Sequence, residues 1–152
     1  MNLQTDNLWE IIRNVRYEDI AQLCQTDRRF LELCRTPQAQ QLFRTLKSKY
    51  MNRIGTILDI FENNTWLLDI LEHLPSEAKK EWSLVARSHI RTFVENNPRV
   101  DRAMLYSIVS DPGRFSNVPL AKQFKDEVNT IFLSRHPEYV NILENYLAKL
   151  GL

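Results

Sequence analysis

Apolar residues recur at spacings of three and four along most of the chain, which is the pattern of amphipathic α-helices. No stretch alternates apolar and polar residues for long enough to predict a strand. The chain contains only 3 glycines, so few positions favour interruptions of these helices. The sequence therefore predicts an all-α fold.

The first 50 residues predict a module of three short helices followed by the start of a fourth helix. We expect Asp6 to cap the first helix, and acidic residues near Glu18 to begin the second. Thr26 is expected to cap the third helix, while Thr36 caps and Pro37 opens the fourth. The apolar stripes of these four helices contain, in order, Leu8, Ile11, Ile12 and Val15; Ile20, Leu23 and Cys24; Phe30, Leu33 and Cys34; and Ala39, Leu42, Phe43, Leu46 and Tyr50.

The rest of the chain predicts a helical bundle of about five to six helices. Short helices are expected over residues 54–61 and 66–74, and a longer helix capped by Ser76 should end before Pro98. A further helix begins near residue 101, and two more open at the prolines of positions 119 and 137. Gly151 fits the C-cap of the last helix. We therefore predict an N-terminal module over residues 1–50 and a helical interaction domain over residues 51–152.

Composition and charge exclude several classes of protein. Hydrophobic residues make up 43% and charged residues 26%, which is typical of a globular chain and not of a disordered one. The longest apolar runs span only a few residues, so no membrane insertion is expected, and the N-terminus shows no signal-peptide pattern. A net charge of +1 gives no general attraction to nucleic acid.

The two cysteines, Cys24 and Cys34, both fall at apolar helix positions. Cysteine at such positions behaves as a small buried hydrophobic residue. We therefore expect two buried thiols in preference to a disulfide, which would suit a reducing compartment.

The sequence offers no convergent set of catalytic groups. The three histidines, His73, His89 and His136, do not match a known metal-ligand spacing. No glycine-rich phosphate loop occurs, and adjacent carboxylates such as those of residues 18 and 19 diverge on a helix. We therefore expect no catalytic residue, no cofactor site and no metal site, and we expect His89 to be a hydrogen-bonded residue at the edge of the core.

A basic cluster on the fourth predicted helix offers an alternative function. Lysine and arginine at helical spacing can follow a nucleic-acid backbone, as Arg44, Lys47, Lys49 and Arg53 would here. The same residues fit the solvated polar face of that helix, which is the interpretation we favour. Binding to nucleic acid is therefore kept as a minor hypothesis.

The order of residues between positions 3 and 43 resembles an F-box. Asp19-Ile20 matches the Asp-Leu that opens the second helix of the family pattern, Thr26 its small residue, and Arg28-Arg29-Phe30 its basic-basic-aromatic run. Gln4, Asp6 and Gln40 depart from the family, which has proline, glutamate and often tryptophan at those places. The resemblance covers about a quarter of the chain.

The resemblance implies a non-enzymatic adaptor. Its first helices would dock on a Skp1-like adaptor protein, and its C-terminal part would present another protein for ubiquitin transfer. A small helical module that cannot bury every apolar side chain leaves a surface suited to such a partner. The matching positions, which are expected either to bind the partner or to fill the core, are Leu3, Leu8, Ile11, Ile12, Val15, Asp19 and Ile20.

A structural role is the main alternative. Short F-box-like proteins with unclassified helical tails resemble those encoded by large DNA viruses, and such a chain could serve as a virion or capsid-associated assembly component. The adaptor hypothesis predicts a cytoplasmic or nuclear location in a eukaryotic cell, including a virus-infected one, and the structural hypothesis predicts the virion. The partners would be a Skp1-like adaptor in the first case and assembly neighbours in the second.

Overall fold

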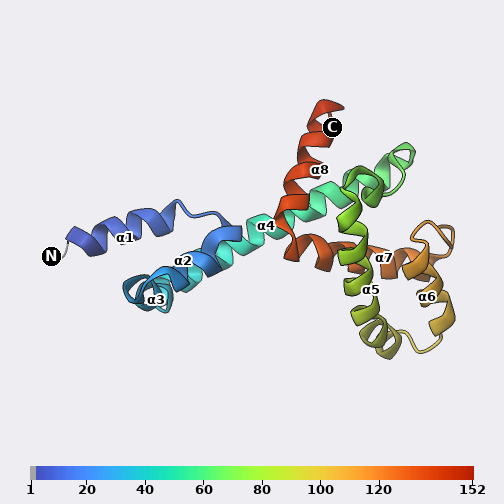
Figure 1. Ribbon diagram of the computed structural model, residues 1–152, viewed down its shortest axis with the longest axis horizontal. Helices are drawn as coiled ribbons and strands as arrows, with labels where there is room; N and C mark the ends of the chain where they lie inside the picture. The colour runs from blue at the N-terminus through green and yellow to red at the C-terminus, as the bar shows by residue number, and fades with distance from the viewer. Residues whose placement is uncertain (1–2) are drawn as a thin grey trace. The chain divides into compact units, whose positions relative to one another are not determined.

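The computed structural model describes the backbone of residues 3–152 and the side chains of residues 7–152. Within this range the chain forms α-helices and short 3-10 helices and contains no strand (Figure 1). The predicted all-α fold is therefore confirmed. The structure divides into two units, Met1–Asn52 and Arg53–Leu152, and the boundary falls inside one long helix.

The first unit consists of short helices connected by tight turns and the first half of a long helix. Its elements are α1 (Leu3–Arg13), the 3-10 turn η1 (Tyr17–Asp19), α2 (Ile20–Thr26), α3 (Arg28–Cys34) and the beginning of α4 (Pro37–Asn63). Among the side chains described in this unit, those of Ile12, Phe30, Cys34, Ala39 and Tyr50 form the buried core. Tyr17 also packs on Tyr50, with ring centroids 4.9 Å apart, which ties η1 to α4.

The cysteine prediction was wrong. Cys24 of α2 and Cys34 of α3 form a disulfide, with their Cα atoms 6.0 Å apart. The helical pattern placed both residues correctly on inward faces, but it could not show that the turn at Asp27 folds α3 back against α2. The bridge therefore links the two shortest helices of a small unit.

The second unit is a bundle built around α5 (Ser76–Asn96). α6 (Arg102–Ser110) and α7 (Pro119–Arg135) both pack against α5, and α7 also contacts α8 (Pro137–Lys149) (Figure 1). The 3-10 turns η2 (Thr65–Leu67) and η3 (Ile70–His73) connect α4 to α5, and η3 contacts α8. Its buried side chains include Trp82, Phe93, Leu105, Phe124, Phe132, Val140 and Leu143.

One polar interaction is enclosed within this core. The indole Nε1–H of Trp82 on α5 donates a hydrogen bond of 2.7 Å to Oδ1 of Asn129 on α7. Both residues are buried, and Asn129 is the one buried polar residue found in the described part of the chain. Because the two groups satisfy each other, the contact fixes the register of α5 against α7 at little desolvation cost.

Several helix ends follow the predicted capping signals. Thr36 accepts the amide of Ala39 through its Oγ1 at 3.3 Å, and Pro37 is the first residue of α4. The prolines at positions 119 and 137 open α7 and α8. Gly151 adopts a φ of 76° after α8, and the amides of Gly151 and Leu152 bond back to the carbonyls of residues 148 and 147. This arrangement is a Schellman motif, which closes the helix as the sequence predicts.

Other predicted caps were wrong by a few residues. α1 begins at Leu3, so Asp6 lies inside it and does not cap it. The cap of α3 is Asp27, whose carboxylate accepts the amides of residues 29 and 30, whereas Thr26 donates to the carbonyl of residue 22. Ser76 is the first residue of α5 and has Pro75 before it as the cap position. At α3 the reason is visible, because Asp27 beside Thr26 supplies the side-chain cap.

The connection between residues 50 and 75 differs most from the prediction. A single helix, α4, replaces the two helices expected over residues 37–50 and 54–61. The apolar positions Tyr50, Ile54, Ile57 and Phe61 continue one helical stripe, and their burial carries the helix through Gly55 despite the low helix propensity of glycine. The helix expected over residues 66–74 is wrong, because Leu68 has a φ of 61° that separates two 3-10 turns.

Candidate protein-binding surface

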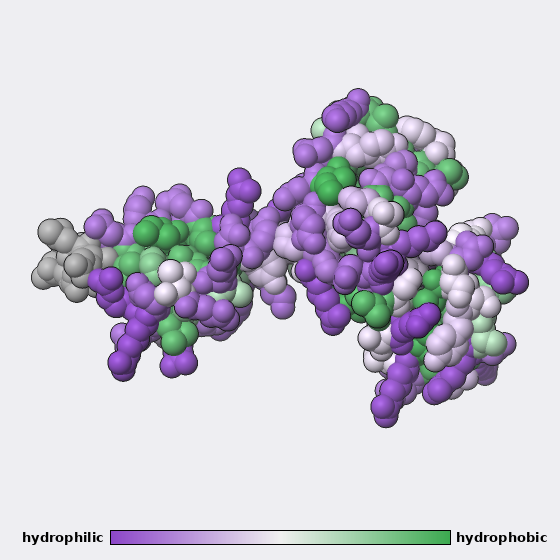
Figure 2. Space-filling view, in the orientation of Figure 1, coloured by the Kyte–Doolittle hydropathy of each residue, from purple (hydrophilic) through white to green (hydrophobic). Residues whose placement is uncertain are grey.

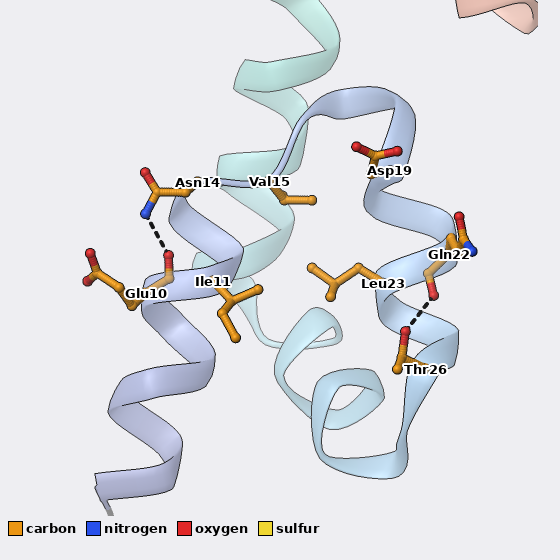
Figure 3. A pocket seen from close by; sticks show the side chains of 8 residues that line it. All are labelled: Glu10, Ile11, Asn14, Val15, Asp19, Gln22, Leu23 and Thr26. Atoms are coloured by element: carbon orange, nitrogen blue, oxygen red, sulfur yellow. Dashed lines mark hydrogen bonds between the residues drawn. The ribbon is translucent and has the colours of Figure 1, made fainter.

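A groove lies between α1 and α2 in the first unit. It has a volume of about 570 Å³. Its walls come from the C-terminal half of α1, the turn that follows, η1 and the inner face of α2 (Figure 3). The residues that line it are Glu10, Ile11, Asn14, Val15, Asp19, Gln22, Leu23 and Thr26.

The middle of the groove is apolar. Figure 3 shows the side chains of Ile11 on α1, Val15 on the turn that follows and Leu23 on α2 pointing into the space between the two helices. Ile11 remains 48% exposed, and the other two are half-buried, so this apolar surface is incompletely covered by the chain itself. Figure 2 shows hydrophobic side chains gathered on the visible surface of the first unit. Such a patch on a small folded unit is the usual mark of a partner surface.

The edges of the groove are polar. Asn14 donates from Nδ2 to the carbonyl of Glu10 at 2.8 Å, and Thr26 donates from Oγ1 to the carbonyl of Gln22 at 3.0 Å. Each bond fixes a polar side chain at the edge of the groove to the backbone of the helix on its own side. Glu10 and Asp19 add two exposed carboxylates, one on each side. An apolar centre with a polar rim is the composition found in protein–protein interfaces.

Only some of the predicted site residues line the groove. Ile11, Val15 and Asp19 line the groove together. Ile12 is 0% exposed and belongs to the core of the unit, so its side chain does not contribute to this surface. Leu8 and Ile20 are half-buried and lie outside the groove lining, and the side chain of Leu3 lies outside the described residues.

The sequence did not single out the rest of the lining. The sequence pattern placed Leu23 on the apolar stripe of the second helix, and it predicted no binding role for Glu10, Asn14, Gln22 or Thr26. The signal was partly visible, because residues 11, 14 and 15 share a helix face, as do residues 19, 22, 23 and 26. What the spacing could not show is that the two faces are turned toward each other.

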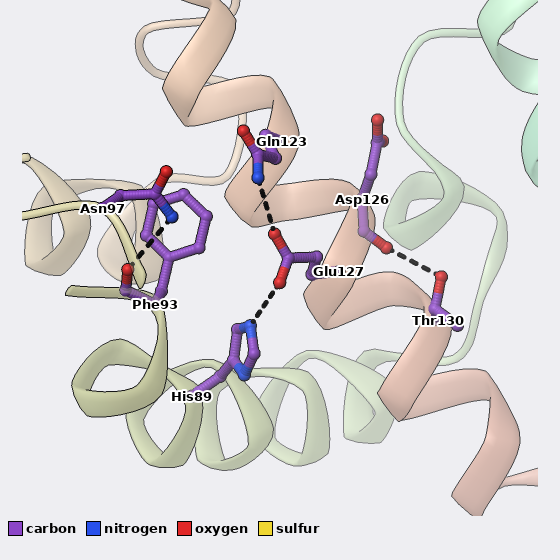
Figure 4. Close-up of polar contacts among 7 residues, drawn as sticks. All are labelled: His89, Phe93, Asn97, Gln123, Asp126, Glu127 and Thr130. Carbon is purple, nitrogen blue, oxygen red and sulfur yellow. Dashed lines mark hydrogen bonds and ion pairs between the residues drawn. The ribbon is translucent and has the colours of Figure 1, made fainter. Parts of the chain in front are cut away.

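The histidines take structural roles in the second unit. His89 of α5 approaches Oε1 of Glu127 on α7 at 3.1 Å, and Glu127 also accepts a bond from Gln123 (Figure 4). His89 lies nearly parallel to the ring of Phe124, with centroids 6.0 Å apart. This geometry confirms the expected hydrogen-bonded histidine at the edge of the core. It links α5 to α7 on the side away from the carboxylate of Asp126 (Figure 4).

The other two histidines also contact neighbouring elements. The Nε2 atom of His73 lies 2.8 Å from the carbonyl oxygen of Leu67, and its ring stacks on Tyr146 of α8. His136 lies within 3.8 Å of a carboxylate oxygen of Glu81. In the described part of the chain no three His, Cys, Asp or Glu side chains are grouped so that they could hold a metal ion. Nor does any described helix have the length and apolar character needed to cross a membrane.

The basic cluster does not form one continuous surface. Arg53 forms an ion pair with Glu144 and donates a hydrogen bond of 2.9 Å to Oδ1 of Asn141, both on α8. Arg44, Lys47 and Lys49 are exposed on the earlier part of α4. Since Arg53 is engaged within its own unit, the cluster has the character of a solvated helix face with one structural ion pair.

Comparison with known proteins identifies no family for this chain. No protein-family model, no curated protein and no solved structure matches the chain. The resemblance to an F-box therefore stays a prediction from the residues quoted above.

Proposed function

We propose that this chain is a non-enzymatic protein-interaction adaptor that binds a partner protein through the groove between α1 and α2. The supporting observation is the incompletely buried apolar centre formed by Ile11, Val15 and Leu23. Two of these three residues occupy positions where the F-box resemblance places contacts with a Skp1-like adaptor. In this proposal the second unit presents another protein through its helical surfaces, and the chain itself performs no chemistry.

The physical reason for binding is the apolar area left in water. A partner helix that covers Ile11 removes the half of its surface that is still exposed, and it covers part of the half-buried Val15 and Leu23 as well. α3 packs against α2 and supports this wall of the groove before the partner arrives. A preformed surface lowers the ordering cost of association, which favours binding by a unit this small.

The test is direct binding of the purified full chain to a purified Skp1-like adaptor. We expect binding at micromolar concentration that is lost in Ile11→Asp, because a carboxylate would then be placed in the apolar centre. Leu84→Asp is the matched control, since Leu84 is 61% exposed on α5 of the other unit. The control should bind like the unmodified chain.

Two results would contradict the proposal. One is the absence of binding at micromolar concentrations of both proteins. The other is equal binding by the Ile11→Asp variant and the control. If the adaptor does not bind and the chain sediments as a stable oligomer that Ile11→Asp dissociates, the groove serves self-assembly, and the structural alternative replaces the adaptor hypothesis.

A further inference from the structure

A second cleft lies wholly within the Arg53–Leu152 unit. It has a volume of about 510 Å³, within the range of about 300–1,000 Å³ that is usual for ligand-binding pockets. One wall is the end of α4 with the segment over residues 65–72, and the other is the loop over residues 112–117 with the first turns of α7. Ile108 of α6 and Asn129 of α7 complete the lining.

Two strained residues line this cleft. Leu68 has φ 61° and ψ −128°, and Phe115 has φ 62°. They are the two residues other than glycine with positive φ in the described part of the chain. Such conformations are unfavourable for a residue with a side chain, and they cluster at binding sites. Both come from loops, and they are far apart in sequence.

Burial within the chain does not account for the strain. Leu68 is 67% exposed and Phe115 is 37% exposed, so neither side chain gains the contacts that a core position would give. Glycine would fit both backbones without strain. The chain therefore places an apolar side chain on each side of the same cleft at a cost in stability, and a binding role explains both positions.

The charges in the cleft are unevenly paired. Lys122 forms an ion pair with Glu62 at 2.7 Å, and Lys125 forms one with Asp69. Asp126 is exposed and has no ion-pair partner at contact distance among the described residues. Partial desolvation and the charge of Glu62 raise its pKa, while the charges of Lys122 and Lys125 act in the opposite direction. Carboxylates outnumber cations in the lining of the cleft. The carboxylates are those of Glu62, Asp69, Glu72 and Asp126, and the cations are those of Arg114, Lys122 and Lys125.

Two further polar residues that line the cleft, Arg114 and Asn129, have partners within the chain. Arg114 lies over the ring of Phe115, with its guanidinium carbon 5.5 Å from the ring centroid. Asn129 is held by the indole of Trp82. Asp126 and Glu72 are therefore the carboxylates of the cleft that have no counter-charge at contact distance among the described residues, and Asp126 lies on α7 beside the two lysines that are already paired.

We propose that this cleft binds a short segment of a partner protein in which an apolar side chain is followed by lysine or arginine. The apolar side chain packs between Leu68 and Phe115, and the cation pairs with Asp126. Polar groups of the 112–117 loop, which lines the cleft with Gly113, Ser116 and Asn117, lie within reach of the bound backbone. This site lies in the other unit from the α1–α2 groove, so either proposal can fail without the other.

The test uses the full chain labelled with ¹⁵N and three capped tetrapeptides. The probes are Gly-Phe-Lys-Gly, its glutamate counterpart Gly-Phe-Glu-Gly, and Gly-Ser-Lys-Gly, which lacks the apolar side chain. We expect the first to shift amide signals of residues 65–72 and 112–117 with a dissociation constant of about 1 mM, and the other two to bind at least about fivefold more weakly. No shifts at about 5 mM peptide, or equal binding of the lysine and glutamate probes, would overturn the proposal.

Variants separate the two halves of the site. Asp126→Asn should remove the preference for lysine over glutamate while keeping the preference for phenylalanine over serine. Leu68→Gly should raise the melting temperature, because it relieves the backbone, and should weaken binding of Gly-Phe-Lys-Gly about threefold or more. Leu84→Ala, outside the cleft, should leave binding unchanged. Unchanged binding in both Asp126→Asn and Leu68→Gly would show that the cleft is not the site.

Discussion

Two adjacent isoleucines on α1 should lose very different amounts of stability when they are truncated to alanine. Ile12 is 0% exposed in the core of the first unit, whereas Ile11 is 48% exposed at the groove. Ile12→Ala removes fully buried methyl and methylene groups and leaves a cavity, which costs about 2–5 kcal/mol. Ile11→Ala removes groups that are half in water already, so its cost should stay below about 1 kcal/mol.

The first unit has little stability to lose. It spans about 50 residues, and a unit of this size is expected to be stable by only a few kcal/mol. We therefore expect Ile12→Ala to unfold the first unit in a large fraction of molecules at 25 °C, while Ile11→Ala leaves it folded. The second unit, with its own core around Trp82 and Phe124, should remain folded in both variants.

Amide signals followed by NMR during a urea titration distinguish the two units in one sample. Signals from residues 7–50 should disappear at lower urea in Ile12→Ala than in Ile11→Ala, and signals from α5 and α7 should report the same midpoint in both. If the two variants lose equal stability, or if Ile11→Ala is the more damaging, the packing of α1 described here is wrong.

Three further predictions concern single contacts. Asn129→Ala leaves the indole N–H of Trp82 buried without an acceptor, and calorimetry should show a loss of about 1–3 kcal/mol; no loss would exclude a buried bond there. Gly151→Ala, at a φ of 76°, should cost about 1 kcal/mol in the same assay, and an unchanged melting temperature would contradict the helix cap. Reduction of the Cys24–Cys34 bridge should destabilise the first unit by about 2–3 kcal/mol in urea; two thiols that react with a maleimide before reduction would contradict the disulfide.

Much of the helical layout could be predicted because its signals are local. Thr36-Pro37 and the prolines at positions 119 and 137 mark helix starts through their own backbone chemistry, and Gly151 marks an end. The failures were of two kinds. The break expected between residues 50 and 54 does not occur, because the apolar stripe of α4 runs through it. The turns over residues 65–73 imitate helical spacing because their buried positions also recur every three or four residues.

The sites depended on information that is not local. The spacing placed Ile11 and Ile12 on one stripe of α1, but only the packing of the unit decides which of them faces the core and which faces the groove. The disulfide required α2 and α3 to fold back on each other. The second cleft brings together two segments that are far apart in the sequence, and nothing in the sequence around Leu68 or Phe115 indicates a positive φ.

The central claim is that a partner protein covers the groove between α1 and α2. Hydrogen-exchange mass spectrometry of the full chain, alone and with a Skp1-like adaptor, tests this most directly. We predict slower exchange over residues 8–26 in the complex, with unchanged exchange in α5 and α7. Unchanged exchange over residues 8–26 at saturating adaptor, or protection confined to the second unit, would contradict the account.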